Sequence, residues 1–558
     1  MNNNEFERTP VTPERLQPAR YFAANYAGEH VAGTEFVIGA MFVAWGVSTG
    51  DILWGLLWGN LLAVLTWGLI CAPIAVSTRL TLYAYLEKIA GPGTIRVYSV
   101  VNGLLFCVLA GTMITVSASA VRIPFGIDPQ TQWYPTSLSF IAVVLLVGAV
   151  VVYIAARGFR GVAQFAEVCA PWMILIFLLG ALSMLPVLAG ATDGIDGMGS
   201  LANLRVVADQ WVWRGEGGGE ITAWHVAAFA WICNLAMHGG LSDMTVLRYA
   251  RRASYGYFSV LGMFIGHYAA WVFAGIMGAG AAMLLGATIS AIDAGEVAYQ
   301  ALGTAGILAV IIAGWTTANP TIYRAGLAFQ SLNPRWDRVR VTMVVGVVTT
   351  AIACFPFVFS RLMDFVGIMG LVLSPIGAVI VTEHWILPRL GMTRYWSHYR
   401  GQHTNWPAIA AWAGSLALAA GLGFSGALHL FFLLIPTWIT ATLVYLVLAG
   451  PAGARQSFPV AVEAETREAQ RQADERSWLE ESARSATGEG SVTGSSGFGV
   501  YRALALLGLA ACLAMGVATF MGGMALETFR QWLILPTVFY FVMAWLWMRA
   551  REGGRENG

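Results

Sequence analysis

Residues 223–250 read AWHVAAFAWICNLAMHGGLSDMTVLRYA, and they decide the fold. The stretch begins as an apolar run long enough to enter a bilayer, stops being apolar at residues 238–243, and becomes apolar again at Met244. Within lipid every backbone N–H and C=O group must be paired, so two glycines followed by a carboxylate are tolerated only where they are buried in protein or line a cavity. We therefore predict a broken helix at 238–243 and a binding site at the break.

A second interruption lies about 200 residues earlier. Residues 30–35 read HVAGTE and precede the apolar run FVIGAMFVAW, so both interruptions fit the pattern His-x-small-x-(Ser/Thr)-(Glu/Asp). The alternative is coincidence, because so loose a pattern recurs by chance in a long chain. Paired interrupted spans in corresponding positions of two halves are typical of the binding site of a secondary transporter. The two segments are therefore predicted to lie face to face inside the bilayer.

The composition indicates a membrane protein. Hydrophobic residues make up 57% of the chain and charged residues only 11%, whereas roughly 25% of a soluble domain is charged. A net charge of +1 gives no reason to expect nucleic acid as a partner. The cysteines stand in apolar runs without a CxxC pair, so we expect buried thiols rather than disulfides or metal ligands: Cys71, Cys107, Cys169, Cys233, Cys354 and Cys512. The polar N-terminus lacks the apolar core of a signal peptide.

A bilayer span needs about 20 mainly apolar residues, and the chain offers fourteen such segments. The first ten form two blocks of five, and each block begins with an interrupted span. Because five is odd, the second block enters the membrane from the opposite side, so the repeats are inverted. The predicted spans are 22–46, 53–76, 98–121, 137–157, 164–190, 223–249, 255–287, 304–330, 341–359, 362–387, 406–422, 425–449, 499–522 and 529–549.

These spans divide the chain into predicted parts. Residues 451–498 have a charged middle made of good helix formers, which predicts a short surface helix, and a Gly/Ser tail that reads as flexible. Spans thirteen and fourteen are almost wholly apolar, which fits peripheral packing or a homo-oligomer contact. The parts are a tail at 1–21, a five-helix repeat at 22–190, an external loop at 191–222, a second repeat at 223–387, helices 11–12 at 388–450, a linker at 451–498, helices 13–14 at 499–549 and a tail at 550–558.

Arginine and lysine placement predicts the orientation. With the N-terminus inside, the external segments hold few arginines, and most of the others fall in cytoplasmic segments. This bias follows the positive-inside rule and places both termini in the cytoplasm of a multi-pass protein of the cell (inner) membrane. The external arginines are Arg122, Arg205, Arg214, Arg361 and Arg530.

Ionisable residues at membrane depth are expensive and are therefore functional candidates. Glu35 and Asp243 are the main pair, because each follows a glycine-containing break; their carboxylates could bind a cationic or NH-rich solute, take up a proton, or pair with histidine or arginine. For Asp243 the alternative is an ion pair with Arg248. The further candidates are Glu29, unless it lies near a membrane surface, His30, His238, and His267, unless it is a satisfied histidine on a packed face.

The eighth span contains the polar run Trp315-Thr316-Thr317-Ala318-Asn319-Pro320-Thr321. The hydroxyls of Thr316 and Thr317, together with carbonyls freed by the broken first span, would offer the oxygen ligands that sodium requires. The alternative is that the threonines bond back to their own helix.

Several motifs in chain order resemble those of the purine/cytosine permease (nucleobase:cation symporter-1) family, within the amino acid-polyamine-organocation superfamily. They are Gly59–Leu62, Trp231 with Asp243–Arg248, Trp315–Thr317 with Tyr323–Gln330, and Ser374–Gly377 with Glu383-His384. The resemblance covers roughly residues 20–450. It implies an all-α LeuT-type fold of two inverted five-helix repeats, here with additional C-terminal transmembrane helices.

The resemblance also implies symport of a small nitrogen-containing solute with sodium or protons, and no other cofactor. Trp231 would be the aromatic platform for the solute, and Thr316 and Thr317 would bind the cation. The family's asparagine after these threonines is displaced, so Thr321 stands at its place with Asn319 nearby. The other residues expected at the substrate site are Gly33, Glu35, His238, Gly239 and Asp243.

Two departures from the family bear on the solute. Many relatives carry a tryptophan and a glutamine in span three, where this chain has Leu109–Met113. Glu35 is not expected in a nucleobase carrier. A compact cationic or amidine-like solute, held by Glu35 and stacked on Trp231, is thus an alternative to a nucleobase.

The first hypothesis is accordingly a symporter that works by alternating access. The second is a membrane receptor on a transporter scaffold that binds the solute without translocating it and signals through residues 451–498. We expect no enzymatic activity, because the sequence contains no nucleophile motif, metal cluster or phosphate loop, and His/carboxylate pairs five residues apart do not share a helix face.

Overall fold

Helices that can cross a membrane dominate the chain. A computed structural model describes residues 8–556 except 131, 157, 196, 197, 334 and 489–495. In this part of the chain, eleven helices are long and apolar enough to span a bilayer. The two predicted interrupted spans and the 16-residue helix α15 (Arg338–Ala353) account for the other predicted crossings. The tail of the predicted linker at 489–495 lies outside the described residues.

The first repeat begins with the broken span. Helix α1 ends at His30, three residues depart from helical structure, and α2 begins at Thr34. Here the prediction from the sequence is confirmed. The elements of this repeat are α1 (Ala19–His30), α2 (Thr34–Ala44), α3 (Thr49–Thr66), a π-helical turn η2 (Trp67–Cys71), α4 (Ala72–Thr78), α5 (Leu82–Val121), α6 (Leu138–Ala155) and α7 (Gly158–Gly190).

The second repeat is broken over a longer stretch than the sequence predicts. Helix α9 ends at Ile232, a single turn follows at α10, and residues 239–243 are non-helical. The break therefore begins at Cys233, ahead of the predicted residues 238–243. The elements are α9 (Ala223–Ile232), α10 (Leu235–His238), α11 (Met244–Leu247), η5 (Ala253–Phe258), η6 (Leu261–Ala269), α12 (Ala270–Leu285), α13 (Ala294–Leu302), α14 (Thr304–Gln330), α15, α16 (Val358–Val381), η8 (Thr382–Ile386) and α17 (Leu387–Arg389).

The backbone of the second break satisfies itself locally. The N–H groups of Ser242 and Asp243 donate to the carbonyls of Ala236 and Met237, each at 3.1 Å. Leu241 adopts a left-handed conformation with φ 64°, which turns the chain between these bonds. A buried interruption is stable in a membrane only with its polar groups paired in this way.

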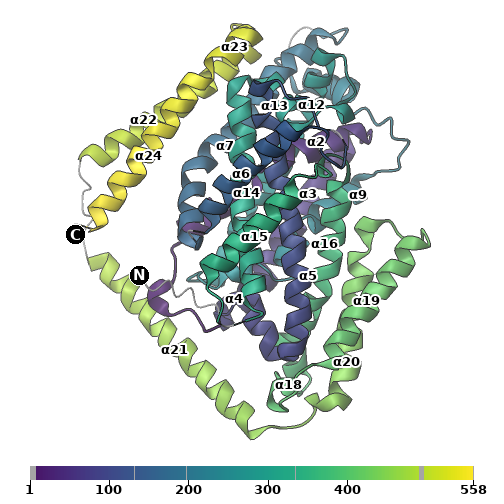
Figure 1. Cartoon of the computed structure of the whole chain (residues 1–558), viewed down its shortest axis with the longest axis vertical. Coiled ribbons are helices and arrows are strands. Elements are labelled where there is room, and N and C mark those ends of the chain that lie inside the picture. Colours follow the sequence, from purple (N-terminus) through teal and green to yellow (C-terminus); the bar gives the residue numbers. More distant parts are fainter. Residues whose placement is uncertain are drawn as a thin grey trace.

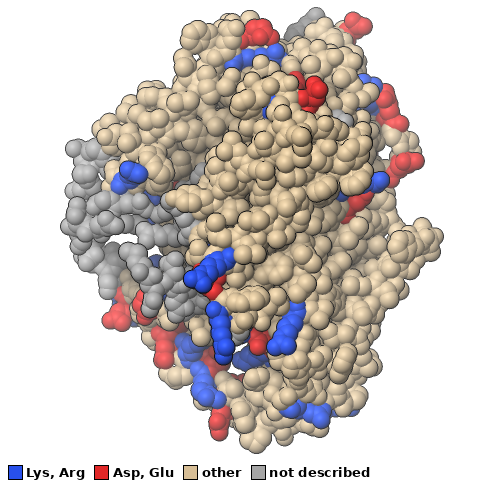
Figure 2. Space-filling model, viewed as in Figure 1, with Lys and Arg blue, Asp and Glu red and all other residues tan. Residues whose placement is uncertain are grey.

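The remaining helices lie at the periphery. Figure 1 shows α19 (Trp406–Phe424) and α20 (Leu434–Ala449) on one side of the repeats, with α22 (Ser496–Phe520), α23 (Leu526–Trp532) and α24 (Ile534–Glu556) on the other. The last hairpin packs on α7, where the Trp172 indole donates to Thr537 at 3.2 Å and the Tyr540 hydroxyl donates to the Val168 carbonyl at 2.8 Å. Figure 2 shows few charged side chains in the middle of this face, as expected of a surface that faces lipid.

The predicted surface helix of the linker is α21 (Pro459–Gly488), which runs beneath the repeats in Figure 1. The carboxylate of Glu475 pairs with the fully buried guanidinium of Arg79, which also donates to the carbonyls of Arg248 and Ala250. Gln472 donates to the carbonyl of Ser77 at 3.2 Å. The linker helix is thus fastened to the ends of the second and sixth spans.

Candidate functional site

A small cavity of about 40 Å³ lies between the first break and residues 233–237. Residues of the first break and residues 233–237 of the second line it together with α5, η6, α14 and α16. The two broken spans therefore meet, but the predicted residues 238–243 are not among the lining residues. A cavity needs about 10–15 Å³ for each water, so this one holds about three waters, and a larger solute requires the helices to move apart. The lining includes Glu29, His30, Ala32, Thr34, Glu35, Ile38, Leu109, Met113, Cys233, Asn234, Met237, His267, Thr317, Thr321, Leu362 and Val366.

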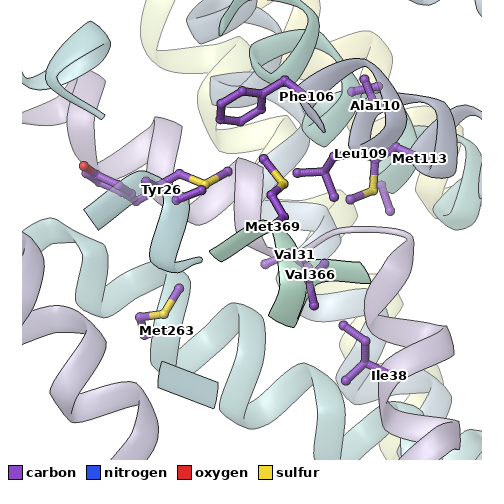
Figure 3. Packing of buried hydrophobic residues seen from close by; sticks show 14 of the residues in the cluster. Tyr26, Val31, Ile38, Phe106, Leu109, Ala110, Met113, Met263, Val366 and Met369 are labelled. Atoms are coloured by element: carbon purple, nitrogen blue, oxygen red, sulfur yellow. The ribbon is translucent and has the colours of Figure 1, made fainter. Parts of the chain in front are cut away.

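One wall of the cavity is apolar. Figure 3 shows Leu109 and Met113 of α5 near Val366 of α16 and near Val31 at the first break. Leu109 and Met113 belong to the segment in which the predicted family has a tryptophan and a glutamine. The wall from the third span therefore offers a solute hydrophobic contact but no hydrogen bond from a side chain.

The opposite wall carries the carboxylate of Glu35. The Trp271 indole N–H donates to one carboxylate oxygen, and His267 Nε2 lies 3.9 Å from the other. The His267 ring stacks on Trp271 with 4.4 Å between the ring centroids, and the Asn234 amide lies 3.3 Å from His267 Nε2. Glu35 is thus a buried acceptor held in place by two aromatic residues, with no arginine or lysine among its described contacts.

Close packing by two glycines brings His30 against the seventh span. A side chain at Gly266 would meet the His30 carbonyl oxygen at 2.2 Å, and one at Gly262 would meet its ring at 2.7 Å. His30 then lies 5.4 Å from His267 between ring centroids. The His30 imidazole accordingly lines the cavity beside that of His267.

Oxygen atoms of the eighth span face the first break. The Thr317 hydroxyl donates to the carbonyl of Glu29 at 2.8 Å and lies 3.2 Å from that of Ala313, which also accepts from the Thr316 hydroxyl at 3.1 Å. The threonines therefore bond to their own helix, as the alternative interpretation predicts, and Thr317 also reaches the first break. A cation at these hydroxyls stays a prediction. Two hydroxyls and two carbonyls at this point are hard ligands that suit a small alkali cation.

On one side of the cavity the helices are joined by buried ion pairs. The Arg324 guanidinium of α14 pairs with Glu29 of α1 and with Asp243, whose Oδ1 lies 2.6 Å from Arg324 Nη2. Tyr26 and Trp67 donate to the other oxygen of Asp243 at 3.0 and 2.7 Å. We call Glu29, Asp243 and Arg324 the buried clamp; each of these residues is 4% exposed or less.

A cluster of aromatic rings lies farther along the first span, beyond the lining residues of the cavity. Phe229 lies 5.8 Å from Phe42, 5.7 Å from Trp271 and 5.1 Å from Phe431, measured between ring centroids. Along the first span, Tyr26 and Glu29 beside the buried clamp come first, the residues that line the cavity follow, and Phe42 comes last. Along this span the cavity therefore lies between the buried clamp and the aromatic cluster.

The structure brings only some of the predicted site residues to the cavity. Thr321 lines it and donates to the Thr317 carbonyl at 2.7 Å. Trp231 lies on the face of α9 toward α3, where its indole donates to Thr66 at 3.1 Å, so its role as a solute platform stays a prediction. His238 Nε2 lies 2.9 Å from the Trp231 carbonyl, and the buried Asn319 side chain lies off the cavity lining.

Gly33 and Gly239 act through packing. A side chain at Gly33 would meet Val116 at 2.8 Å and the backbone nitrogen of Gly314 at 3.2 Å, so its absence lets the first break approach α5 and α14. The carbonyl of Gly239 lies so close to α16 that a side chain at Gly377 would meet it at 1.7 Å. Contact of these glycines with a solute stays a prediction.

Sequence reasoning did not single out Arg324 as a site residue, and the alternative that it gave for Asp243, an ion pair with Arg248, is wrong. The ion pair of Asp243 is with Arg324 rather than Arg248, which donates to the Thr245 carbonyl and the Tyr249 hydroxyl, both at 3.1 Å. Glu29 is buried and pairs with Arg324, while its depth in the membrane stays a prediction. The sequence did contain a signal for Arg324, because this arginine lies inside the predicted span 304–330, 20 residues after the span begins.

The fold belongs to a class of known transporters. Structures similar to this chain include Mhp1, a nucleobase-cation-symport-1 family transporter, in a closed conformation with bromovinylhydantoin bound: TM-score 0.62, 14% identity, covering 84% of this chain and 99% of that one. Mhp1 in an inward-facing conformation gives a TM-score of 0.59 at 14% identity, over 84% and 97% of the two chains.

A substrate-bound, outward-open Na⁺-coupled sialic acid symporter gives a TM-score of 0.57 at 14% identity, over 82% of this chain and 94% of that one. No family model matches the sequence, and no curated protein matches it. At these identities the likeness establishes the fold, which is the predicted arrangement of two inverted five-helix repeats.

Proposed function

We propose that the protein is a cation-coupled symporter that carries a small nitrogen-containing solute by alternating access. It would lie in the cell (inner) membrane with both termini in the cytoplasm. The observation that carries this proposal is the small cavity at the junction of two broken helices, with Glu35, His30 and His267 in its lining and the buried clamp beside it. A site near mid-membrane between two repeats is where a transporter of this architecture binds its cargo, and its structural neighbours are symporters.

The charges around the cavity support a cationic solute. Glu29, Asp243 and Glu35 provide three carboxylates, and Arg324 provides one guanidinium among the described residues in contact with them. Buried charge without a partner is costly in a membrane. A coupling cation and a solute with an ammonium or amidine group would offset this excess, and we propose that Glu35 binds the solute.

The position of the coupling cation is proposed from the oxygen ligands of the eighth span. Sodium at the Thr316 and Thr317 hydroxyls and the carbonyls of Ala313 and Glu29 would tie α14 to the first break. Glu29 is also a member of the buried clamp through its side chain. The cation would bind the backbone carbonyl of Glu29, and the buried clamp holds the side chain of the same residue. Occupation of the cation site therefore biases the separation of α1 from α14.

Uptake into proteoliposomes tests the function. Radiolabelled amines, amidines and nucleobases selected by thermal shift should accumulate only with an inward sodium gradient. Accumulation that follows a proton gradient and ignores sodium would assign the coupling to the buried carboxylates. Saturable binding without accumulation under either gradient would reject the symporter and favour the receptor hypothesis.

A further inference from the structure

An apolar groove of about 600 Å³ lies on the outer face of the helices, away from the transport cavity. It runs between α5, the end of α14 and α15. Phe329 and the buried Cys107 form part of its lining; Phe329 packs so close to α5 that a side chain at Gly103 would meet its ring at 2.6 Å. The walls include Leu104, Val344 and Val348, which are 48%, 65% and 42% exposed.

Two arginines line the groove where α14 ends and α15 begins. Arg335 and Arg340 are exposed, and neither has an ion-pair partner among the described residues. The carboxylate of Asp337 also lines the groove, where one of its oxygens caps α15 by accepting the Arg340 backbone N–H at 3.0 Å, so the two arginines leave an excess of positive charge there. Trp336, 47% exposed, stands beside them, as expected of a residue at the level of the lipid headgroups.

We propose that this groove binds one anionic phospholipid, with the phosphate at Arg335 and Arg340 and an acyl chain along Leu104, Val344 and Val348. The groove combines two features that a phospholipid matches: an apolar channel on a membrane-spanning surface, and at its end two arginines without an ion-pair partner in the part of the chain that the structure describes. Figure 2 shows blue side chains, with red ones among them, on the lower part of the face in view, below a largely uncharged surface. Basic sites between transmembrane helices recognise anionic headgroups by this chemistry.

The groove also adjoins the transport machinery. Helix α14 carries Thr317 and Arg324, and its last residues line the groove. A lipid held between α5, α14 and α15 stabilises the packing of these three helices against one another. The site does not depend on the identity of the solute or of the coupling ion.

The test uses the purified full chain in detergent with phosphatidylglycerol or phosphatidylcholine of identical acyl chains, and native mass spectrometry to measure binding. Each arginine near an anionic lipid contributes about a fivefold factor in affinity. R335Q/R340Q should therefore weaken phosphatidylglycerol binding about 25-fold and leave phosphatidylcholine binding unchanged. The control R389Q/R467Q removes two exposed arginines that lie off the groove and should bind both lipids as the parent does.

A second variant tests the apolar part. Val344→Trp fills the groove without changing charge and should also weaken phosphatidylglycerol binding, while glycerophosphoglycerol, which lacks acyl chains, should not compete at equal concentration. Equal losses in the two arginine double variants would overturn the proposal, since they would indicate a general charge effect. Unchanged binding by Val344→Trp, or full competition by the chainless headgroup, would also overturn it.

Discussion

Removal of the Arg324 guanidinium is the perturbation that most sharply tests the buried clamp. Arg324→Met leaves the carboxylates of Glu29 and Asp243 buried without their cation, although Tyr26 and Trp67 still donate to Asp243. Breaking a buried ion pair by removing one partner costs about 3–5 kcal/mol. Because the clamp joins α14 to α1 and to the second break, we expect this cost to appear as easier separation of these helices.

The lining residue Cys233 provides the assay. In a variant with Cys233 as its only cysteine, alkylation by a small maleimide reports access to the cavity. A shift of even 2 kcal/mol toward an open state corresponds to a roughly 30-fold higher open population. We expect Arg324→Met to accelerate alkylation by at least that factor while uptake falls to background.

A matched control separates gating from general destabilisation. Arg122 is also buried and pairs with Asp293 at 2.7 Å, but this pair lies away from the cavity. Arg122→Met should lower thermal stability without accelerating alkylation of Cys233. The triple variant E29Q/D243N/R324M, which removes the charges together, should recover much of the stability lost in Arg324→Met. Equal alkylation rates in Arg324→Met and the parent would refute the role of the clamp.

Three further substitutions test other parts of the protein. Glu35→Gln should reduce solute affinity roughly 30-fold or more, because it removes one partner of a buried charged contact; uptake assays should show this while the control Glu296→Gln transports normally. Thr317→Ala should raise the sodium concentration for half-maximal uptake roughly 10- to 100-fold, from the loss of a ligand to a charged group, whereas Thr350→Ala, whose hydroxyl bonds within α15, should leave it unchanged. Glu475→Gln should accelerate amide hydrogen exchange in α21 about tenfold or more, because Arg79 loses its buried partner. The exposed Glu480 gives the control E480Q. Equal exchange rates in the two variants would show that the contact between Glu475 and Arg79 does not anchor α21.

The sequence predicted both broken helices because an interruption is a local property. Glycines and a carboxylate inside an apolar run are visible without any knowledge of neighbours, and α1, α2, α10 and α11 end or begin close to the predicted points. The second break starts earlier, at Cys233, because the backbone leaves the helix at Asn234, whose amide lies beside His267 of another span.

The partners of the buried charges could not be predicted in the same way. Arg324 lies 295 residues from Glu29 and 81 from Asp243 in sequence, so only the packing of α14 against both breaks brings them together. Arg248 is close to Asp243 in sequence, yet at five residues' separation it does not share a helix face with it. The position of Trp231 away from the cavity could not be predicted from the sequence either. Its indole faces α3, where it donates to Thr66, and this contact depends on how α9 packs against α3.

The central claim is that the solute binds between the two breaks. A structure of the protein with a transported solute in sodium would test it most directly. We expect density for the solute between residues 30–35 and 233–237, with a nitrogen within hydrogen-bonding distance of Glu35 and an enlarged cavity. Solute density elsewhere, with the small cavity unchanged in a protein that still transports, would contradict the claim.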